Sequence, residues 1–263
     1  MSTVVFLGGG RITSAMLAGL RLRKTKHHLV VHDRNPGKVR NLKKRYAIAG
    51  EPDLKTAVEM ADILIIAVRP SSVRELLRAI DEMKRPMLAV SVAAGVPLRA
   101  LTKWAGPPVR WVRAMPSPVC RSGRGLTAVT CHRTLPRADR KRVHSFFASI
   151  GQVVEIPESK LDAFTVTFSC SHGYHALATL ARAAQEAGLD REAARLASAH
   201  ALADGIIAWR EGKHPLESLL KEAATPGGVA AATTTAMDAA GYGRAVRQGV
   251  AAGLRRTRLT TGK

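Results

Sequence analysis

The chain has 263 residues, enough for one large or two modest domains with a substantial apolar core. Hydrophobic residues make up 46% of it, a share that excludes an intrinsically disordered chain. No apolar run approaches the roughly 18 residues of a membrane-spanning helix. Cys120, Cys131 and Cys170 show no CxxC spacing, and the first residues lack a basic leader with a cleavage site. We therefore expect a reduced, cytoplasmic protein without a membrane partner.

The charge is strongly positive. Lys and Arg total 41 against 20 Asp and Glu, which gives a net charge of +21. Residues 1–50 hold eleven of these basic residues and one acidic residue, Asp33. Such a field attracts polyanions, whether nucleic acids or phosphorylated cofactors. Aromatic residues are only 4% of the chain, too few for a base-stacking surface, so we do not expect nucleic acid as the main partner. Basic side chains that simply face solvent are the alternative.

Short apolar runs alternate with helical stretches through the first half of the chain. Continuous runs of this kind are typical of strands buried on both faces of a parallel sheet. Pro36 and Pro70 stand where a helix begins. The pattern predicts an α/β fold with a doubly wound, Rossmann-type sheet. The expected strands are 3–8, 29–33, 61–68, 87–94, 110–115, 126–131 and 152–156, with helices over 11–24, 36–46, 71–83 and 97–105.

The second half of the chain is rich in alanine and shows no strand pattern after Pro157. Apolar residues recur there at helical spacing, which predicts helices over 172–188, 191–211 and 235–258. We therefore expect a dinucleotide-binding domain over 1–157 and an all-helical domain over 158–263. Helices of this composition pack on one another, either within one chain or across a dimer.

A glycine-rich loop follows the first expected strand. Gly8, Gly9 and Gly10 end that strand and open the next helix. Glycines in this position let the backbone approach a pyrophosphate, which the helix N-terminus then faces. The third glycine of the usual pattern is replaced by Thr13, at a position that favours small residues. A plain strand-to-helix turn is the alternative.

The end of the second strand indicates which dinucleotide binds. Asp33 stands about 20 residues beyond the loop, where an acidic residue commonly binds the ribose of NAD(H). Arg34 and Asn35 follow directly, and an arginine there can pair with a 2′-phosphate. With the basic first 50 residues, this favours NADP(H), with NAD(H) as the alternative. Asp33 can also serve as the N-cap of the helix that starts at Pro36.

Two further strand ends are expected beside this loop, because ligands of such sheets lie at the carboxyl ends of the strands. Ala67, Val68, Arg69 and Pro70 follow the third strand. The segment 93–95, Ala-Ala-Gly, follows the fourth. Ordinary turn chemistry at a strand end is the alternative reading of both.

In chain order, the motifs GGG, DRNP, AVRP, SVAAG, MPSP, GLTAV and TPGG resemble those of the pyrroline-5-carboxylate reductase family, along essentially the whole chain. That family reduces a cyclic imine with NAD(P)H to complete proline biosynthesis. The resemblance implies a Rossmann domain followed by a helical domain that forms an interlocked homodimer or a higher oligomer of such dimers. It implies cofactor contacts from Gly8, Gly10, Arg11, Ile12, Asp33, Arg34, Asn35, Ala67, Val68, Arg69, Pro70, Ala93 and Gly95.

Departures from the family pattern fall in the substrate site. Ser117 and Pro118 replace an Asn-Thr pair, and residues 168–174 replace a glycine-rich turn that opens a helix. Ser171 is the expected cap of that helix. Ala230 stands where the family has a threonine that hydrogen-bonds the imine region. The substrate-binding residues that the resemblance implies are Met115, Pro116, Ser171, Tyr174, Gly227 and Gly228.

The loss of that threonine leaves the proton donor open. His172 is one candidate, because histidine readily donates a proton near neutral pH, and Ser117 is another. A histidine that caps or packs at a domain interface is the alternative for His172. No pair of histidines at helical spacing comes with a third ligand, so we expect no metal.

Three functions remain open at this stage. We favour an NADP(H)-dependent reductase of a cyclic imine carboxylate, with 1-pyrroline-5-carboxylate as the first substrate to test and a different imine as the variant. The second is an NADP(H)-binding regulator on the same scaffold that does not catalyse the reaction. The third is a nucleic-acid-binding protein that uses the basic N-terminal half.

Overall fold

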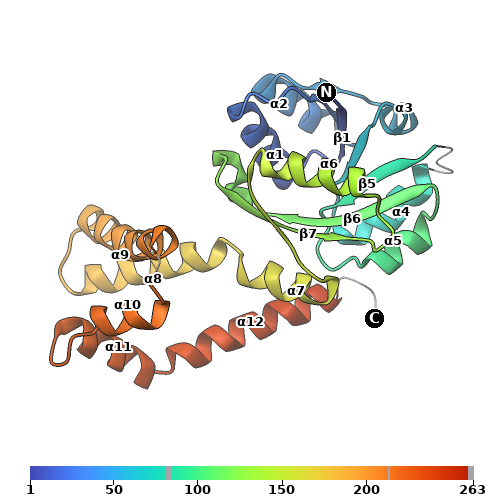
Figure 1. Ribbon diagram of the computed structural model, residues 1–263. Coiled ribbons are helices and arrows are strands. Elements are labelled where there is room, and N and C mark those ends of the chain that lie inside the picture. The colour runs from blue at the N-terminus through green and yellow to red at the C-terminus, as the bar shows by residue number, and fades with distance from the viewer. Residues whose placement is uncertain (81–84, 213, 260–263) are drawn as a thin grey trace. The chain divides into compact units, whose positions relative to one another are not determined.

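A computed structural model describes residues 1–80, 85–212 and 214–259. The chain divides into two compact units (Figure 1). The first comprises Met1–Phe168 and residues 253–259, and the second comprises Ser169–Ala252. The first unit holds the sheet and the second holds only helices in its described part, so the expected α/β fold with a helical second half is confirmed. The domain boundary at 157/158 stays a prediction.

The first unit is built on one eight-stranded sheet with strand order β3-β2-β1-β4-β5-β6-β7-β8. All seven expected strands are present, and β3, only two residues long, is the one that the sequence pattern does not predict. The strands are β1 (Thr3–Leu7), β2 (His28–His32), β3 (Ala49–Gly50), β4 (Ile63–Ile66), β5 (Met87–Ser91), β6 (Val109–Pro116), β7 (Gly125–Cys131) and β8 (Gly151–Glu155).

Neighbouring strands pair in parallel except for β6 and β7, which are antiparallel. The chain length between strands explains the exception. A parallel crossover needs a dozen or more residues, whereas only the short 3-10 helix η2 (Pro118–Ser122) joins β6 to β7. Pro116 and Thr127 are therefore paired across an antiparallel turn. The carboxyl ends of β1, β2, β4, β5 and β6 all lie at one edge of the sheet.

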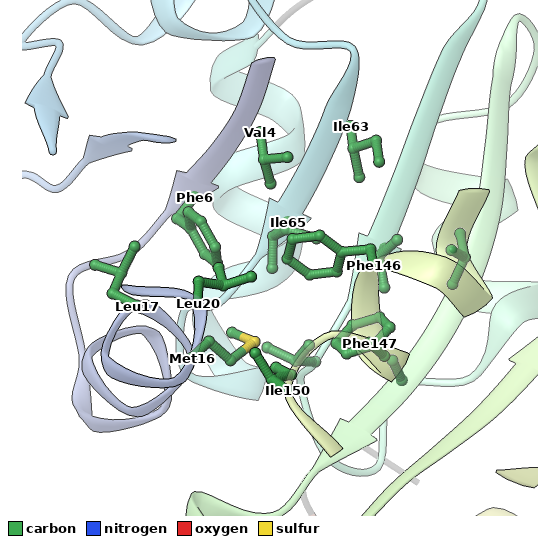
Figure 2. Packing of buried hydrophobic residues seen from close by; sticks show 14 of the residues in the cluster. Val4, Phe6, Met16, Leu17, Leu20, Ile63, Ile65, Phe146, Phe147 and Ile150 are labelled. Carbon is green, nitrogen blue, oxygen red and sulfur yellow. The ribbon is translucent and has the colours of Figure 1, made fainter. Parts of the chain in front are cut away.

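Alternate residues of the central strands face two separate cores, which explains why the strands read as continuous apolar runs. Val4 and Phe6 of β1 belong to one core, and Val5 and Leu7 to the other. Figure 2 shows part of the first core, with Phe6 of β1 beside Leu20 of α1, and with Met16 of α1 and Phe146 and Phe147 of α6 in the same cluster. Helices α3, α4 and α5 cover the second core.

The sequence pattern predicts some helices of the first unit with other bounds and does not predict others. The expected helix 71–83 begins as a 3-10 turn, its α-helical part is Val73–Ile80, and residues 81–83 lie outside the described residues. Three helices, α3, α6 and α7, are not predicted. The helices are α1 (Arg11–Leu22), α2 (Pro36–Tyr46), α3 (Leu54–Glu59), η1 (Pro70–Ser72), α4 (Val73–Ile80), α5 (Leu98–Trp104), α6 (Arg137–Ala148) and α7 (Glu158–Thr167).

The second unit contains α8 (Ser171–Glu186), α9 (Arg191–Glu211), α10 (Leu216–Ala223), α11 (Val229–Ala239) and most of α12 (Tyr242–Leu259). The expectation of one helix over 235–258 is wrong. Helix α11 ends at Ala239, and Gly241 follows with a φ of +88°, a conformation that glycine adopts without steric cost. Among the described helices, none is long and apolar enough to cross a membrane.

Candidate functional site

The glycine loop is fixed to two neighbouring strand ends by its backbone. The Gly8 N–H donates to His32 O at 2.8 Å, and the Ala67 N–H donates to Leu7 O at 2.8 Å. Gly8 has a φ of +114°, and a Cβ there would lie 2.6 Å from Ala67 O. Only glycine meets both conditions, so the ends of β1, β2 and β4 come together through this residue. The structure thus brings together the first three predicted cofactor segments.

The next positions of the loop face open space. A Cβ built at Gly10 would meet no atom within 4 Å. Gly10 is the N-cap of α1, whose first turn contains no acidic residue and includes the exposed Arg11 and the half-buried Ile12. The first N–H groups of a helix have no partner within the helix, and its dipole makes this end positive. The open loop and this helix end together suit a pyrophosphate.

Thr13 fills the position of the missing third glycine without opening the loop. It is fully buried, and its hydroxyl donates to Gly8 O at 2.5 Å. A small side chain is tolerated there because its hydroxyl forms a hydrogen bond to the glycine loop. The departure from the usual glycine pattern therefore leaves the candidate phosphate site intact.

Asp33 anchors the glycine loop from the end of β2. Its Oδ2 accepts from the Gly9 N–H at 2.7 Å, and its Oδ1 accepts from the Asn35 N–H at 2.8 Å. Lys38 Nζ lies 3.5 Å from Oδ2. Partial burial raises the pKa of Asp33, but these two hydrogen bonds and the Lys38 charge outweigh it, and the pKa is lowered overall. The carboxylate is thus stabilised in its charged form.

The alternative role of Asp33 as the N-cap of α2 is wrong. Asn35 is the cap, and its side-chain oxygen accepts from the Gly37 N–H at 2.9 Å. Two residues separate an Asx side chain from the N–H that it reaches, so the residue directly before Pro36 is better placed than Asp33. The predicted start of the helix at Pro36 is confirmed.

Arg34 extends into solvent at the same strand end. Its Nη1 lies 3.2 Å from Glu75 Oε1, a residue of α4 that is distant in sequence. Both side chains are largely exposed, with 79% of Arg34 and 71% of Glu75 accessible. The guanidinium is therefore available to an anionic ligand at the cost of a surface ion pair.

The remaining predicted cofactor residues lie along the same edge of the sheet. Val68, Arg69 and Pro70 lead from β4 into η1, with Arg69 exposed. The segment 93–95 follows β5, whose end is tied to β4 by the Val92 N–H, which donates to Ile66 O at 3.0 Å. Ala93 is buried in the second core.

The end of β6 carries the last predicted residues of the first unit. Met115 packs with Leu161 of α7, and Ala94 lies against the same small cluster. Pro116 is buried as the final residue of the strand. Ser117 is only 7% exposed, and its hydroxyl accepts from the Val119 N–H at 3.2 Å as the cap of η2. Its catalytic role stays a prediction.

The predicted residues of the second unit lie at two helix starts. His172 and Tyr174 are exposed in the first turn of α8, and Tyr174 is 65% accessible. The expectation that Ser171 caps this helix is wrong: Cys170 holds the cap position, and Ser171 is the first helical residue, with its hydroxyl 2.8 Å from that of Ser169. The second start is that of α11.

At α11, Gly228 is the N-cap and its N–H donates to Thr225 O at 2.9 Å, which closes the turn that contains Gly227. Ala230 lies exposed in the first turn of that helix. Both helix starts present backbone N–H groups that a carboxylate can bind.

Comparison with known proteins assigns the chain. A family model described as pyrroline-5-carboxylate reductase dimerisation matches residues 158–259, and one described as NADP oxidoreductase coenzyme F420-dependent matches residues 3–95. The pyrroline-5-carboxylate reductase of Mycobacterium leprae is 30% identical over 212 residues, 77% of this chain and 72% of that protein. This chain belongs to the pyrroline-5-carboxylate reductase family. The reductase of Synechocystis sp. is 28% identical over 256 residues, 95% of each chain.

Solved structures of the same family share the fold. The pyrroline carboxylate reductase of Plasmodium falciparum, solved with NADP bound, has a TM-score of 0.89 at 21% identity and covers 98% of both chains. The reductase of Coxiella burnetii has a TM-score of 0.88 at 20% identity and covers 100% of this chain and 99% of its own. The whole-length agreement confirms the predicted fold.

Proposed function

We propose that this protein reduces 1-pyrroline-5-carboxylate to proline with NADP(H) as the cofactor. The observation that carries the proposal is the match to curated pyrroline-5-carboxylate reductases along 95% of the chain, from the glycine loop to the last helices. The open cradle at Gly10 and the positive end of α1 support the cofactor part of the proposal.

The residues of the chain hold and orient the reactants. Gly8 shapes the loop, Gly10 leaves room for the pyrophosphate, and Arg34 pairs with the 2′-phosphate. When bound, NADPH supplies a hydride to the carbon of the C=N bond. The segment 93–95 and Met115 shape the end of the site that holds the nicotinamide ring.

The substrate part of the proposal rests on the second unit. The start of α8, with Ser171 and Tyr174, and the turn at Gly227 and Gly228 bind the substrate carboxylate through helix N-termini. His172 supplies the proton that the imine nitrogen needs, with Ser117 as the second candidate. The products are proline and NADP+, so the hydride and one proton account for the reduction.

The assembly and location of the protein complete the proposal. The dimerisation family model over residues 158–259 and the exposed apolar side chains of the second unit support a homodimer. The similarity to bacterial pyrroline-5-carboxylate reductases supports a cytoplasmic location.

The test is NADPH oxidation followed by absorbance with pyrroline-5-carboxylate, with NADH and other cyclic imine carboxylates in parallel. We expect turnover that is faster with NADPH than with NADH. Binding of NADPH without turnover of any imine would favour a regulator on the same scaffold. Turnover of another imine alone would replace the substrate in the proposal.

A further inference from the structure

The charges around Asp33 point to an additional residue that controls which cofactor binds. We infer that Glu75 is a specificity-determining residue: it competes for the guanidinium of Arg34 with the 2′-phosphate of the cofactor and so lowers the preference for NADP(H) over NAD(H). This inference rests on the proposed function, because it assumes that a dinucleotide binds at the glycine loop.

Asp33 stands where an acidic residue commonly binds the ribose, but its carboxylate already holds the glycine loop in place. Both oxygens of Asp33 accept backbone N–H groups, from Gly9 at 2.7 Å and from Asn35 at 2.8 Å, and its side chain is only 12% exposed. Each oxygen already accepts one backbone hydrogen bond, and little of the side chain is left exposed for a ribose diol. Discrimination between the two cofactors therefore falls to the exposed charges around it.

The charge of Asp33 is also compensated. Lys38, in the first turn of α2, lies 3.5 Å from its Oδ2, and that turn contains no acidic residue. The repulsion that Asp33 would exert on a phosphate is thereby reduced. Arg34 and Lys38 are then two cations next to the positive end of α2, an arrangement that favours a 2′-phosphate over a hydroxyl.

Glu75 opposes this arrangement from the neighbouring helix α4. Its Oε1 lies 3.2 Å from Arg34 Nη1. Any phosphate that pairs with Arg34 comes within the Debye length of about 8 Å of this carboxylate, so the repulsion is incompletely screened. The ion pair itself is a surface pair with 79% and 71% of its side chains accessible, and pairs of this kind contribute little. The expected effect of removing the carboxylate is a two- to fivefold change in affinity.

The test measures equilibrium binding of NADP+ and NAD+ by calorimetry, so that it does not depend on turnover. The variant Glu75→Gln removes the charge and keeps the shape. We expect its Kd for NADP+ to fall two- to fivefold while its Kd for NAD+ stays unchanged. The matched control is Glu59→Gln, which makes the same charge change at an exposed position near the end of α3. It should alter neither Kd.

Two further variants separate the inference from the proposed function. Arg34→Gln tests the 2′-phosphate contact alone, and Arg34→Gln/Glu75→Gln tests whether Glu75 acts through Arg34. We expect Arg34→Gln to lower the NADP+ preference about tenfold and the gain from Glu75→Gln to disappear in the double variant.

Each of the other outcomes overturns either the inference about Glu75 or the proposed function. If Arg34→Gln lowers the preference but Glu75→Gln leaves it unchanged or lowers it, Glu75 does not compete and the inference fails while the proposed function stands. If the gain persists in the double variant, Glu75 acts without Arg34 and the inference also fails. If the wild-type protein binds neither dinucleotide, the proposed function fails with it.

Discussion

The two units of this protein differ in how far their apolar side chains are buried. In the first unit, strands of the central sheet are buried on both faces, and the loop at Gly8 is fixed within the chain. In the second unit, few described residues are buried, among them Ala181, Ala194 and Ser198. Large apolar side chains are exposed there instead: Leu180, Leu189, Leu196, Ile206, Ile207, Trp209, Leu216, Leu220 and Met237.

The difference shows that contacts within the chain bury the apolar side chains of the first unit and leave many of those of the second unit exposed. Contacts within the first unit hold the proposed cofactor loop in place, so we expect changes there to act on binding directly. The second unit leaves large apolar side chains exposed on its described helices, and the proposed homodimer would cover them. Changes there should act through assembly, which separates the two units experimentally.

Gly8→Ala should have the largest effect, because it disrupts the proposed cofactor loop. A Cβ would lie 2.6 Å from Ala67 O, and alanine at a φ of +114° is strained by about 1–3 kcal/mol before any clash. We expect the Tm to fall by at least about 5 °C and NADP+ binding to be lost. Differential scanning calorimetry and binding calorimetry measure both.

Gly10→Ala is the matched control for that change. Gly10 has an ordinary φ of −81° and open space around a built Cβ. We expect its Tm to stay within about 2 °C of wild type while NADP+ affinity falls at least tenfold, because the methyl group takes space in the cradle. Full NADP+ affinity in this variant would contradict the placement of the pyrophosphate.

Leu196→Asp should disrupt the proposed homodimer, which the second unit is expected to form. Leu196 is 61% exposed on α9. A carboxylate in a buried apolar interface is costly, so we expect monomers by light scattering and at least a tenfold loss of imine reduction. Leu22→Asp is the control, since Leu22 is 59% exposed in the first unit. If both variants keep the wild-type mass, the helical face does not form the dimer.

Asp33→Asn should weaken the binding of NADP+ and of NAD+ equally. The amide places a donor against the N–H of either Gly9 or Asn35, and hydrogen bonds to a charged group contribute about 1.5–3 kcal/mol each. We expect the Kd values for NADP+ and NAD+ to rise about tenfold together. A rise for NAD+ alone would mean that Asp33 reads the ribose instead of anchoring the loop.

The smallest expected effect is the pH dependence of the stability that Asp33 contributes. The lowered pKa of Asp33 means that its folded-state value lies below the ordinary 3.8. A group with a depressed folded pKa contributes stability above its unfolded pKa and loses it as the pH falls through the folded value. The difference in unfolding free energy between wild type and Asp33→Asn should be constant from about pH 7 to 5 and shrink only below about pH 4. A difference that shrinks near neutral pH would contradict this anchor role.

Much of the first unit could be predicted because its signals are local. Continuous apolar runs identify strands, and Pro36 identifies the start of α2. Helix α6 was missed because five of its first six residues are charged, and its apolar contacts come from only Val143, Phe146 and Phe147. Its existence follows instead from topology, since β7 and β8 are parallel and need a crossover.

The details of the site depend on contacts that sequence patterns do not contain. The pairing of Arg34 with Glu75 joins residues 41 positions apart, and no local spacing indicates it. Lys38 lies within one helical turn of Pro36, so its proximity to Asp33 could have been inferred from the predicted start of α2. The prediction that Ser171 caps α8 is wrong because the backbone is already helical at Cys170, with φ of −61° and ψ of −12°.

The most direct test of the central claim follows the hydride itself. Wild-type protein is incubated with pyrroline-5-carboxylate and NADPH that carries deuterium at one or the other position of the nicotinamide C4, and the proline formed is analysed by mass spectrometry. The account predicts deuterated proline from one of the two labelled cofactors, in equal amount to the NADPH consumed. Unlabelled proline from both, or NADPH consumption without proline, would contradict it.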